Sequence, residues 1–294
     1  MQDSDLLYYE PVFTGDGSEG NPYLFDFENY TLSYSFNSTT VGIHVENITK
    51  YLVIRNLKLR NTNTSVRGTG IEIYANNVIL DNISIDNTLI GFQLEGDDLH
   101  LNYSVVKSRD FGIKALNCNS LNITSTNITG ATYGAFFQSC NQTIVSNNFV
   151  SSGVHGIQMY FCINFKIEGN IISQNSGKGL FIVETPPKSG SVNYVFRNIF
   201  YQNEIQAQIV TDEINTVFYN EEERIGNYWS DWRRWGKYTI QKDVYDLYPL
   251  GQNLEPASQY PFKFWFWIFA PIIVGFGTVA YFFYWKLVLQ PTKQ

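Results

Sequence analysis

The sequence predicts an all-β protein, a right-handed single-stranded parallel β-helix, and two observations carry that prediction. The first is a repeated phrase in which a glycine precedes alternating apolar residues. A fixed period of this size is the signature of a solenoid, in which each unit buries its apolar face against its neighbours. The phrase begins at Gly42, Gly70, Gly91, Gly112, Gly134, Gly156 and Gly179, at steps of 28, 21, 21, 22, 22 and 23 residues, and a degenerate copy, AQIVTDE, begins at Ala207.

The second observation is the composition. Only 16% of the residues are charged and 16% are aromatic, a balance that favours strands over helices. The net charge of -7 argues against a nucleic-acid partner, because such binders need clustered Lys and Arg. Leucine-rich repeats require a leucine consensus that is missing here, and propeller blades need about 40 residues or more.

Each period has room for three short strands, so we expect about eight coils of 21–28 residues. In the second repeat, Ile71 and Ile73 point to one side of the first strand, and Glu72 and Tyr74 point to the other. Equivalent positions in successive coils lie about 4.8 Å apart and form ladders. The expected inner ladder is Ile43, Ile71, Phe92, Ile113, Ala135, Ile157 and Leu180.

Two further ladders have predicted structural roles. The cysteines Cys118, Cys140 and Cys162 each follow their glycine by six residues. A soft-metal site and a redox disulfide are the functional interpretations, but stacked thiols in register point in parallel, which favours small apolar fillers at a corner. Asn side chains can satisfy the backbone at a bend, in a ladder of Asn56, Asn82, Tyr103, Ser125, Asn147, Gly169 and Asn198.

The two ends of the chain depart from the repeat. We expect an N-terminal cap and first irregular coil over residues 1–41, repeats over 42–224, and an aromatic C-terminal cap and tether over 225–262. Residues 264–285 carry no charge, which is enough to cross a bilayer. They predict a single transmembrane helix over 263–286, followed by a short tail over 287–294. Trp229, Trp232 and Trp235 of the cap are then candidates for contact with lipid headgroups.

The orientation of the chain in the membrane and the export of the β-helix are predicted from weaker sequence signals than the transmembrane segment itself. Lys286 and Lys293 favour a tail in the cytoplasm and a β-helix outside the cell. The start, MQDSDLLYYE, has no apolar core of a signal peptide, so either an export signal has been removed or the protein is tail-anchored. Glycosylation sequons support an exported surface. They begin at Asn29, Asn37, Asn47, Asn63, Asn82, Asn102, Asn122, Asn127 and Asn141.

The outward positions of the first strand are the candidate functional surface. One column is His44, Glu72, Gln93, Lys114, Phe136, Gln158 and Phe181, and the other is Glu46, Tyr74, Glu95, Leu116, Gln138, Tyr160 and Val183. Glu72 and Glu95 are staggered in adjacent coils, roughly 6–9 Å apart, which overlaps the carboxylate separation of inverting glycosidases. With Glu46 they are weak catalytic candidates, and a solvated acidic face is the competing interpretation.

Binding is the better-supported use of this surface. Sugar rings stack on aromatic side chains while Gln, Glu and Lys bond hydroxyl groups. The same flat, repetitive face could instead dock a protein, and cross-coil packing of aromatic rings explains part of the pattern without any ligand. The candidate binding residues are Tyr74, Gln93, Lys114, Phe136, Gln138, Gln158 and Tyr160.

Motifs at the two ends carry a family resemblance. The opening motif is GDGSEGNPYLFDF at residues 15–27, and the closing motif is GNYWSDW at 226–232 followed by DLYPL at 246–250. Over about residues 14–250 the chain resembles the NosD-like, carbohydrate-binding and sugar-hydrolase type of right-handed parallel β-helix proteins. That resemblance implies that this chain has one of the roles found in the family, which includes surface proteins, a periplasmic copper-maturation factor and sugar-acting enzymes. The family's closing run of Asp and Gly is replaced by RRWGKYTIQKD.

Copper handling is poorly supported by the residues. Copper sites use clustered His, Met or thiolate ligands, whereas His44, His100, His155, Met1 and Met159 are scattered along the chain. We therefore expect no metal and no cofactor.

The sequence as a whole predicts a membrane-anchored β-helix on an archaeal or bacterial cell surface. We expect it to act as a non-catalytic binding or structural module for a carbohydrate or a protein partner. The alternatives are a polysaccharide hydrolase or lyase that uses the carboxylates, and an accessory subunit of a membrane complex of the transporter or metal-maturation type.

Overall fold

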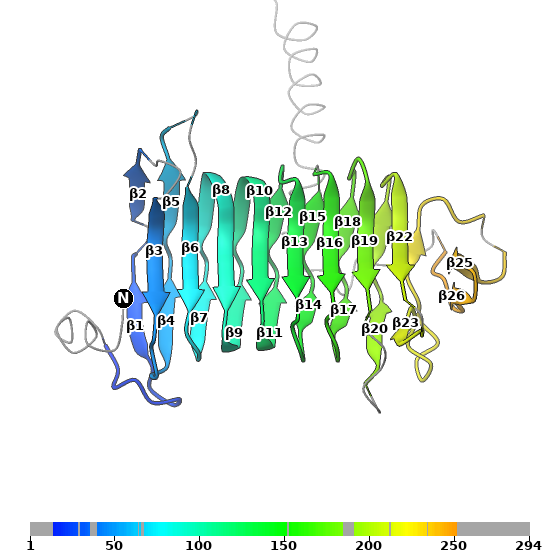
Figure 1. The fold of residues 1–294 in the computed structure, drawn as a ribbon, viewed down its shortest axis with the longest axis horizontal. Helices are drawn as coiled ribbons and strands as arrows, with labels where there is room; N and C mark the ends of the chain where they lie inside the picture. The colour runs from blue at the N-terminus through cyan, green and yellow to red at the C-terminus, as the bar shows by residue number, and fades with distance from the viewer. Residues whose placement is uncertain are drawn as a thin grey trace, which may run out of the picture. The chain divides into compact units, whose positions relative to one another are not determined.

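The protein is an all-β parallel solenoid of about seven turns (Figure 1). The computed structural model describes residues 14–251, apart from 29, 36–39, 64, 66–67, 152, 185–190, 212 and 234. The sequence predicts about eight coils, one more than the structure has, because the coil that starts with the degenerate phrase is incomplete. That phrase forms β22 (Ile205–Val210), but the next two strands, β23 (Thr216–Val217) and β24 (Tyr228–Trp229), have two residues each.

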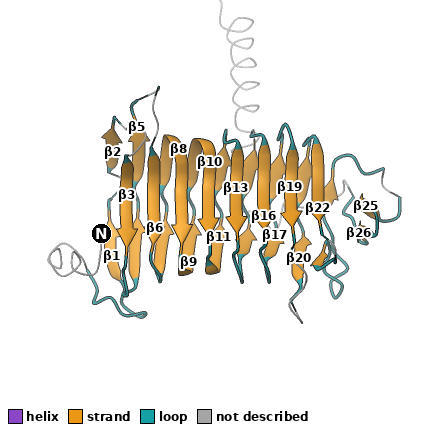
Figure 2. Ribbon diagram, in the orientation of Figure 1, coloured by secondary structure: helices purple, strands orange, loops and turns teal. Residues whose placement is uncertain are grey.

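Three faces of parallel strands make up the solenoid, and all three are seen as arrows in Figure 2. The first face contains the glycine phrases, in β3 (Val41–Glu46), β6 (Thr69–Tyr74), β8 (Ser84–Glu95), β10 (Val105–Leu116), β13 (Tyr133–Gln138), β16 (His155–Tyr160), β19 (Lys178–Val183) and β22. The second face is β1 (Tyr23–Asp26), β4 (Leu52–Arg55), β7 (Val78–Asp81), β9 (Asp97–Asn102), β11 (Asn119–Thr124), β14 (Ile144–Ser146), β17 (Lys166–Glu168), β20 (Asn193–Phe196) and β23. The third face is β2 (Thr31–Tyr34), β5 (Lys58–Asn61), the first halves of β8 and β10, β12 (Asn127–Thr129), β15 (Phe149–Ser151), β18 (Ile171–Ser173), β21 (Ile199–Tyr201) and β24.

At two corners the third-face strand of one coil and the first-face strand of the next form a single strand instead of the expected two. β8 and β10 are 12 residues long and run from the third face around the corner onto the first. The phrases in these two strands are the ones that follow the shortest steps, 21 residues each, so no residues are left for a separate turn. β10 instead turns the corner where its pairing with β8 shifts register, on either side of Ser108.

The recurring glycine is a steric requirement of the corner between the third and first faces. None of the seven glycines has a positive φ, so backbone freedom is not the reason. A Cβ on Gly112 would lie 2.3 Å from Cγ2 of Ile128 and 2.4 Å from the carbonyl oxygen of Gly134. Gly134 is equally crowded by Val150 and Gly156. The phrase therefore begins with glycine because the next coil's backbone occupies the space of a side chain.

The core is one continuous apolar column inside the three faces. The expected inner ladder is buried from Ile71 through Leu180 and is half-buried at Ile43. The N-terminal end is closed by the opening motif, which turns back so that Thr14 pairs with Leu24. Gly15 adopts φ 98°, and a Cβ there would lie 2.0 Å from the carbonyl oxygen of Pro22. The Gly-rich stretch therefore permits this tight return.

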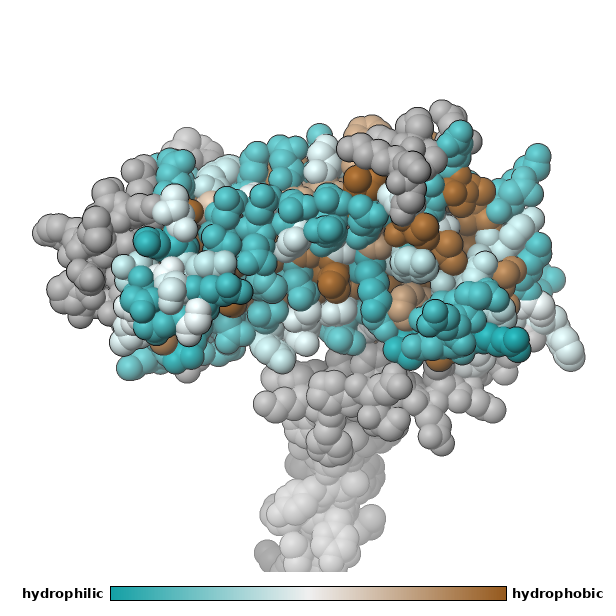
Figure 3. All heavy atoms as spheres, turned by 90° about the horizontal axis from the view of Figure 1, so that it is seen from below, coloured by the Kyte–Doolittle hydropathy of each residue, from teal (hydrophilic) through white to brown (hydrophobic). Residues whose placement is uncertain are grey.

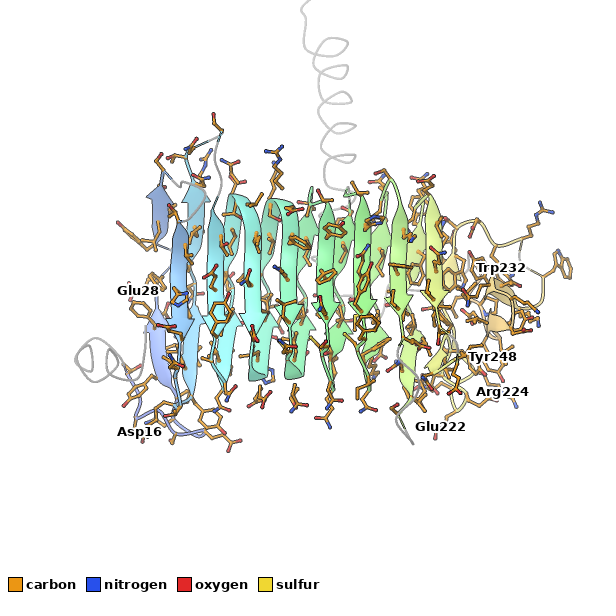
Figure 4. The ribbon with its side chains drawn as sticks, in the orientation of Figure 1. Asp16, Glu28, Glu222, Arg224, Trp232 and Tyr248 are labelled. Carbon is orange, nitrogen blue, oxygen red and sulfur yellow. The ribbon has the colours of Figure 1, made fainter. Side chains whose placement is uncertain are left out.

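Aromatic rings close the C-terminal end. Trp229 of β24 is buried, and its ring stacks on Phe200 at 4.4 Å and on Tyr238 at 4.3 Å between centroids. Tyr238 belongs to an antiparallel hairpin of β25 (Tyr238–Gln241) and β26 (Val244–Asp246). Figure 4 shows Trp232 and Tyr248 at this end of the solenoid, and Asp16 and Glu28 at the other. The expected contact of Trp229 with headgroups is wrong because its ring fills the end of the core, whereas Trp235 is 89% exposed.

A buried polar ladder runs along the corner between the second and third faces, at positions where earlier coils have Leu57 and Ile83. Ser104 accepts the backbone N–H of Ile83, and each Asn rung accepts the backbone N–H of the rung before it and donates its own amide to backbone carbonyls. The hydroxyl of Thr126 donates to the carbonyl of Thr124. The ladder ends on the carboxylate of Asp246 in the closing motif. Its rungs are Ser104, Thr126, Asn148, Asn170, Asn198 and Asn227.

This ladder corrects the placement of Asn198. The predicted bend ladder has a left-handed backbone at all its other members, with φ between 49° and 67°. In the coil after Gly169, however, the residue with this conformation at the equivalent bend is Arg197, with φ 58°. Asn198 lies one position later and belongs to the buried ladder. Asn198 was assigned to the bend ladder because it is an asparagine. The coil after Gly169 is longer than the others, so its length does not show which residue is equivalent to Gly169.

The three cysteines are free and buried in the core. Their thiols donate to backbone carbonyls, as Cys118 does to Leu94 and Leu116, both at 3.4 Å. The hydrogen bond with Cys140, together with burial, raises the pKa of Cys118 and of Cys162. The thiols of Cys118 and Cys162 therefore stay protonated, whereas their hydrogen bonds to Cys140 lower the pKa of that thiol. All three side chains are buried away from solvent, in keeping with their interpretation as fillers.

We expect all three thiols to be inert in the folded protein, since thiolate and access are both required for reaction. Native protein treated with a maleimide should gain no label at Cys118, Cys140 or Cys162. The same protein in guanidinium chloride should gain three, counted by mass spectrometry. Rapid native labelling of any one would show that its coil opens and would contradict the filler role.

The chain divides into two compact units, Met1–Leu250 and Gly251–Gln294. The predicted transmembrane segment 263–286 and the tail 287–294 lie outside the described residues, as does the start of the N-terminal cap. Within the described residues, no helix is long and apolar enough to cross a membrane.

Candidate functional site

The first face brings the predicted outward columns together in the expected register. His44 pairs with Glu72, Glu72 with Gln93, and Gln93 with Lys114. The column continues through Phe136, Gln158 and Phe181, and the second column runs in parallel two residues further along each strand. The spacing of the repeated phrase therefore correctly predicted which side chains lie in each column of this surface.

The N-terminal part of the first face is acidic. Nδ1 of His44 lies 3.1 Å from Oε2 of Glu72, and its Nε2 lies 3.5 Å from Oε2 of Glu46. Next to this group, Gln93 donates a hydrogen bond to the hydroxyl of Tyr74. Burial, followed by the charge of Glu72, raises the pKa of the Tyr74 phenol, so Tyr74 remains a neutral hydrogen-bonding group.

The weak catalytic candidates are engaged by neighbouring side chains. Glu72 and Glu95 have the expected stagger, since Tyr74 pairs with Glu95 and Glu72 with Gln93. Glu95 accepts a hydrogen bond of 3.0 Å from Nδ2 of Asn117. Each carboxylate thus has a local partner, an arrangement that suits a polar surface as well as it suits acid–base chemistry.

The C-terminal part of the first face is aromatic. The rings of Phe111 and Tyr133 stack at 4.8 Å between centroids, and Tyr133 stacks on His155 at 5.5 Å. A second row contacts the first, with Phe136 5.2 Å from Tyr160 and Tyr160 5.7 Å from Phe181. We call this surface the aromatic strip; it consists of Phe111, Tyr133, Phe136, His155, Tyr160 and Phe181, all of them half-buried.

Two lysines lie on the aromatic strip. Nζ of Lys178 is 3.5 Å from the centroid of Phe181, and Nζ of Lys114 is 5.6 Å from that of Phe111. Burial, followed by the charge of Lys178, lowers the pKa of His155. Its Nδ1 accepts the backbone N–H of Lys178 at 3.2 Å. The His155 ring is therefore held neutral and flat against Tyr133, which favours stacking.

The first row, which is half of the aromatic strip, was missed by the sequence prediction. Phe111, Tyr133 and His155 each occupy the position immediately before a glycine of the phrase, and they pair in register. Simple alternation assigns that position to the inside of the strand. The glycine corner reverses the alternation there, so the side chain points outward. The available signal was the repeated aromatic residue before glycine.

The predicted binding residues divide between the two parts of the face. Tyr74 and Gln93 belong to the acidic part, whereas Lys114, Phe136 and Tyr160 belong to the aromatic part. Gln138 is exposed beside them. Gln158 is only 3% exposed, because its column neighbours Phe136 and Phe181 are large rings. It therefore offers little surface to a ligand.

The sequons differ in how well they suit glycosylation, which uses the amide nitrogen of Asn at an accessible surface. Asn82 donates that nitrogen to Asn56, and Asn141 donates it to Asn119. Asn47 lies at an exposed bend. Asn63, Asn102, Asn122 and Asn127 are half-buried, and Asn29 and Asn37 lie outside the described residues.

The described residues do not fit a copper site. They contain no group of three or more His, Cys, Asp or Glu placed to hold a metal ion. His44 and His100 are bonded to carboxylates, and Met159 is buried in the core. Copper ligands need to converge on one point, and these side chains lie in different coils.

Comparisons place these repeats among known proteins. The family model described as periplasmic copper-binding protein (NosD) matches residues 97–188. The middle repeats are thus similar to those of the NosD family, in agreement with the resemblance predicted from the sequence, and the two end motifs lie outside the matched residues. No curated protein matches the chain.

Several solved structures are similar. The mannuronan C-5 epimerase AlgE6 A-module of Azotobacter vinelandii matches with a TM-score of 0.48 and 13% identity, over 63% of this chain and 55% of its own. Pectate lyase Pel9A matches with a TM-score of 0.42 and 9% identity, over 66% and 69%. Dettilon tailspike protein matches with 0.34 and 13%, over 64% and 47%. This chain therefore spans about half the length of the epimerase module.

Proposed function

We propose that the protein is a non-catalytic glycan-binding module displayed at the cell surface, and that the aromatic strip is its binding site. The observation that carries this proposal is the continuous run of half-buried rings over four neighbouring strands, β10, β13, β16 and β19. Sugar rings present C–H faces that pack on such side chains. The polar groups of Lys114, Gln138 and Lys178 lie beside the rings to bond hydroxyl groups.

The geometry favours binding over packing alone. Rings that only filled space would be buried, whereas each ring of the strip keeps part of its surface open. The parallel register holds equivalent side chains about 4.8 Å apart, which gives a rigid, repetitive platform. A preformed platform loses little entropy when an extended chain lies along it. In this proposal the uncharged segment 264–285 anchors the module to the membrane.

Removing two rings tests the proposal. We expect Tyr133→Ala combined with Tyr160→Ala to weaken glycan affinity about tenfold or more, because each lost ring removes about 1 kcal/mol of stacking. A glycan array with wild-type protein identifies the ligand, and calorimetry with that ligand measures the change in affinity.

The matched control is Tyr194→Ala combined with Tyr201→Ala. These tyrosines are each 42% exposed and lie on the second and third faces. The control should bind like wild type. A silent array, or equal affinity of the two double variants, would refute the strip as a glycan site and leave a protein partner as the better explanation.

A further inference from the structure

A depression of about 690 Å³ lies at the corner between the third and first faces, next to the aromatic strip. Ser33, Arg60, Asp86 and Lys107 form one column across its wall, each paired with the next in register. Arg109 lies two residues further along β10 and also lines the depression. The volume is in the range of ligand-binding cavities.

The depression is positively charged, whereas the chain as a whole is negatively charged. The chain has a net charge of -7, yet three cations, Arg60, Lys107 and Arg109, meet here with one carboxylate, Asp86. Asp86 lies 3.6 Å from Nε of Arg60. That is the depression's one ion pair among the described residues, so a surplus of two positive charges faces solvent. Such a concentration attracts anions and raises their local concentration.

The floor of the depression is held rigidly. Nδ2 of Asn61 donates to the carbonyl of Asn87 at 3.1 Å, and Nδ2 of Asn87 donates back to the carbonyl of Asn61 at 2.8 Å. Asn61 is 1% exposed. This reciprocal pair joins two adjacent coils beneath the cations, so the cationic side chains project from a fixed base.

The depression and the aromatic strip are parts of one surface. β10 carries Lys107 and Arg109 near its beginning and Phe111 two residues after Arg109, just past the corner. The carbonyl of Arg109 accepts the N–H of Thr132 at 2.9 Å, and Thr132 directly precedes Tyr133. A chain that stacks on Phe111 and Tyr133 therefore passes directly beside the cations.

We infer that the glycan bound by this protein is anionic, with its carboxylate or sulfate groups in the depression and its sugar rings on the strip. This inference rests on the proposed function and adds the chemical class of the ligand. Arg and Lys form charge-assisted hydrogen bonds with such groups, and Arg109 offers the planar fork that suits a carboxylate or a sulfate. A neutral glycan has no anionic group to pair with the two surplus positive charges of the depression.

The test compares three probes on the full-length protein. They are a mannuronate hexamer, its fully methyl-esterified form, and a sulfated cellohexaose. We expect the esterified hexamer to bind at least about tenfold more weakly than the uronate, because it keeps the rings and loses the charge. Raising the salt concentration should weaken binding of the charged probes only. The preferred charged probe distinguishes carboxylate from sulfate recognition.

The variant Lys107→Gln with Arg109→Gln should lose about 10- to 100-fold in affinity for the charged probe. The control, Arg233→Gln with Lys242→Gln, removes the same charge from exposed positions of the C-terminal cap and should bind like wild type. Equal binding of the acid and its ester, or an unaffected Lys107/Arg109 variant, overturns the inference while glycan binding stands. Failure of every glycan, charged or neutral, overturns the proposed function as well.

Discussion

Replacing Asp246 with Ala is expected to lower the free energy of unfolding by about 3–5 kcal/mol, because it leaves several buried N–H donors without their acceptor at about 1–3 kcal/mol each. Oδ2 of Asp246 accepts hydrogen bonds from the backbone N–H of Asn227 at 2.6 Å, from Nε1 of Trp229 at 2.9 Å and from Nδ2 of Asn227 at 3.3 Å. Oδ1 accepts the N–H of Tyr248 at 3.0 Å. All of these donors would lose their acceptor inside the C-terminal cap, and each orphaned group is costly.

The isosteric variant separates charge from shape. Asp246→Asn retains an oxygen for the Asn227 and Trp229 donors but turns an amide toward the N–H of Tyr248, so its loss should be smaller. Burial raises the pKa of Asp246 above 3.8. The pH-dependent part of its contribution to stability is then complete below pH 3.8 and is lost as pH rises through the folded-state pKa, whereas the hydrogen bonds that its oxygens accept remain. The Asn variant should lack this part of the pH dependence.

Urea unfolding of the three proteins, followed by circular dichroism, measures these differences. Glu222→Ala is a suitable control, because Glu222 is an exposed carboxylate of the same end of the solenoid (Figure 4). It should change the free energy of unfolding by less than about 0.5 kcal/mol. If Asp246→Ala were as mild as this control, the carboxylate would not be the end of the buried ladder.

Replacing Gly112 with Ala is the second large expected effect, a loss of about 3 kcal/mol. The added methyl group would lie 2.4 Å from the carbonyl oxygen of Gly134, and backbone oxygen atoms cannot move aside as a flexible side chain can. Insertion of atoms into a packed site usually costs about 1–3 kcal/mol and occasionally more. Strand separation in a parallel sheet is fixed by hydrogen bonds, so relief would require breaking the ladder of coils.

Gly20 provides the comparison for this prediction. A Cβ at Gly20 would meet no atom within 4 Å, and Gly20 has no positive φ. Gly20→Ala should therefore be neutral or slightly stabilising. Thermal unfolding of both variants distinguishes a steric glycine from a tolerant one. Equal melting temperatures would mean that the phrase's glycine has another origin.

The fold and most of the surface could be predicted because a period of about 22 residues transfers one assignment to every coil. The register of Glu72, Gln93 and Lys114 needed only the position of each glycine. Errors arose where the period fails. In a coil of greater length, Asn198 was assigned to a ladder whose member is its neighbour Arg197. At the glycine corner, Phe111, Tyr133 and His155 point outward although alternation predicts that they point inward.

The corner depression could not be predicted for a different reason. Its cations come from the third face and from the bend of β10, which the repeated phrase does not describe. Their meeting depends on how β8 and β10 turn the corner without a loop. The apolar side chains that gather toward the C-terminal half in Figure 3 were also unexpected. Among the described residues of the C-terminal half, Phe161, Val192 and Val210 are each at least 40% exposed.

The polar ladder has a consequence for how this protein can change length. Each asparagine rung presents the same acceptor to the coil before it and requires the same acceptor from the coil after it. A duplicated coil with Asn at this position could therefore be inserted between Asn148 and Asn198 with every buried donor satisfied. Asp246 has no such freedom, because it terminates the series. Related proteins can thus be expected to differ by whole coils while they retain the closing segment.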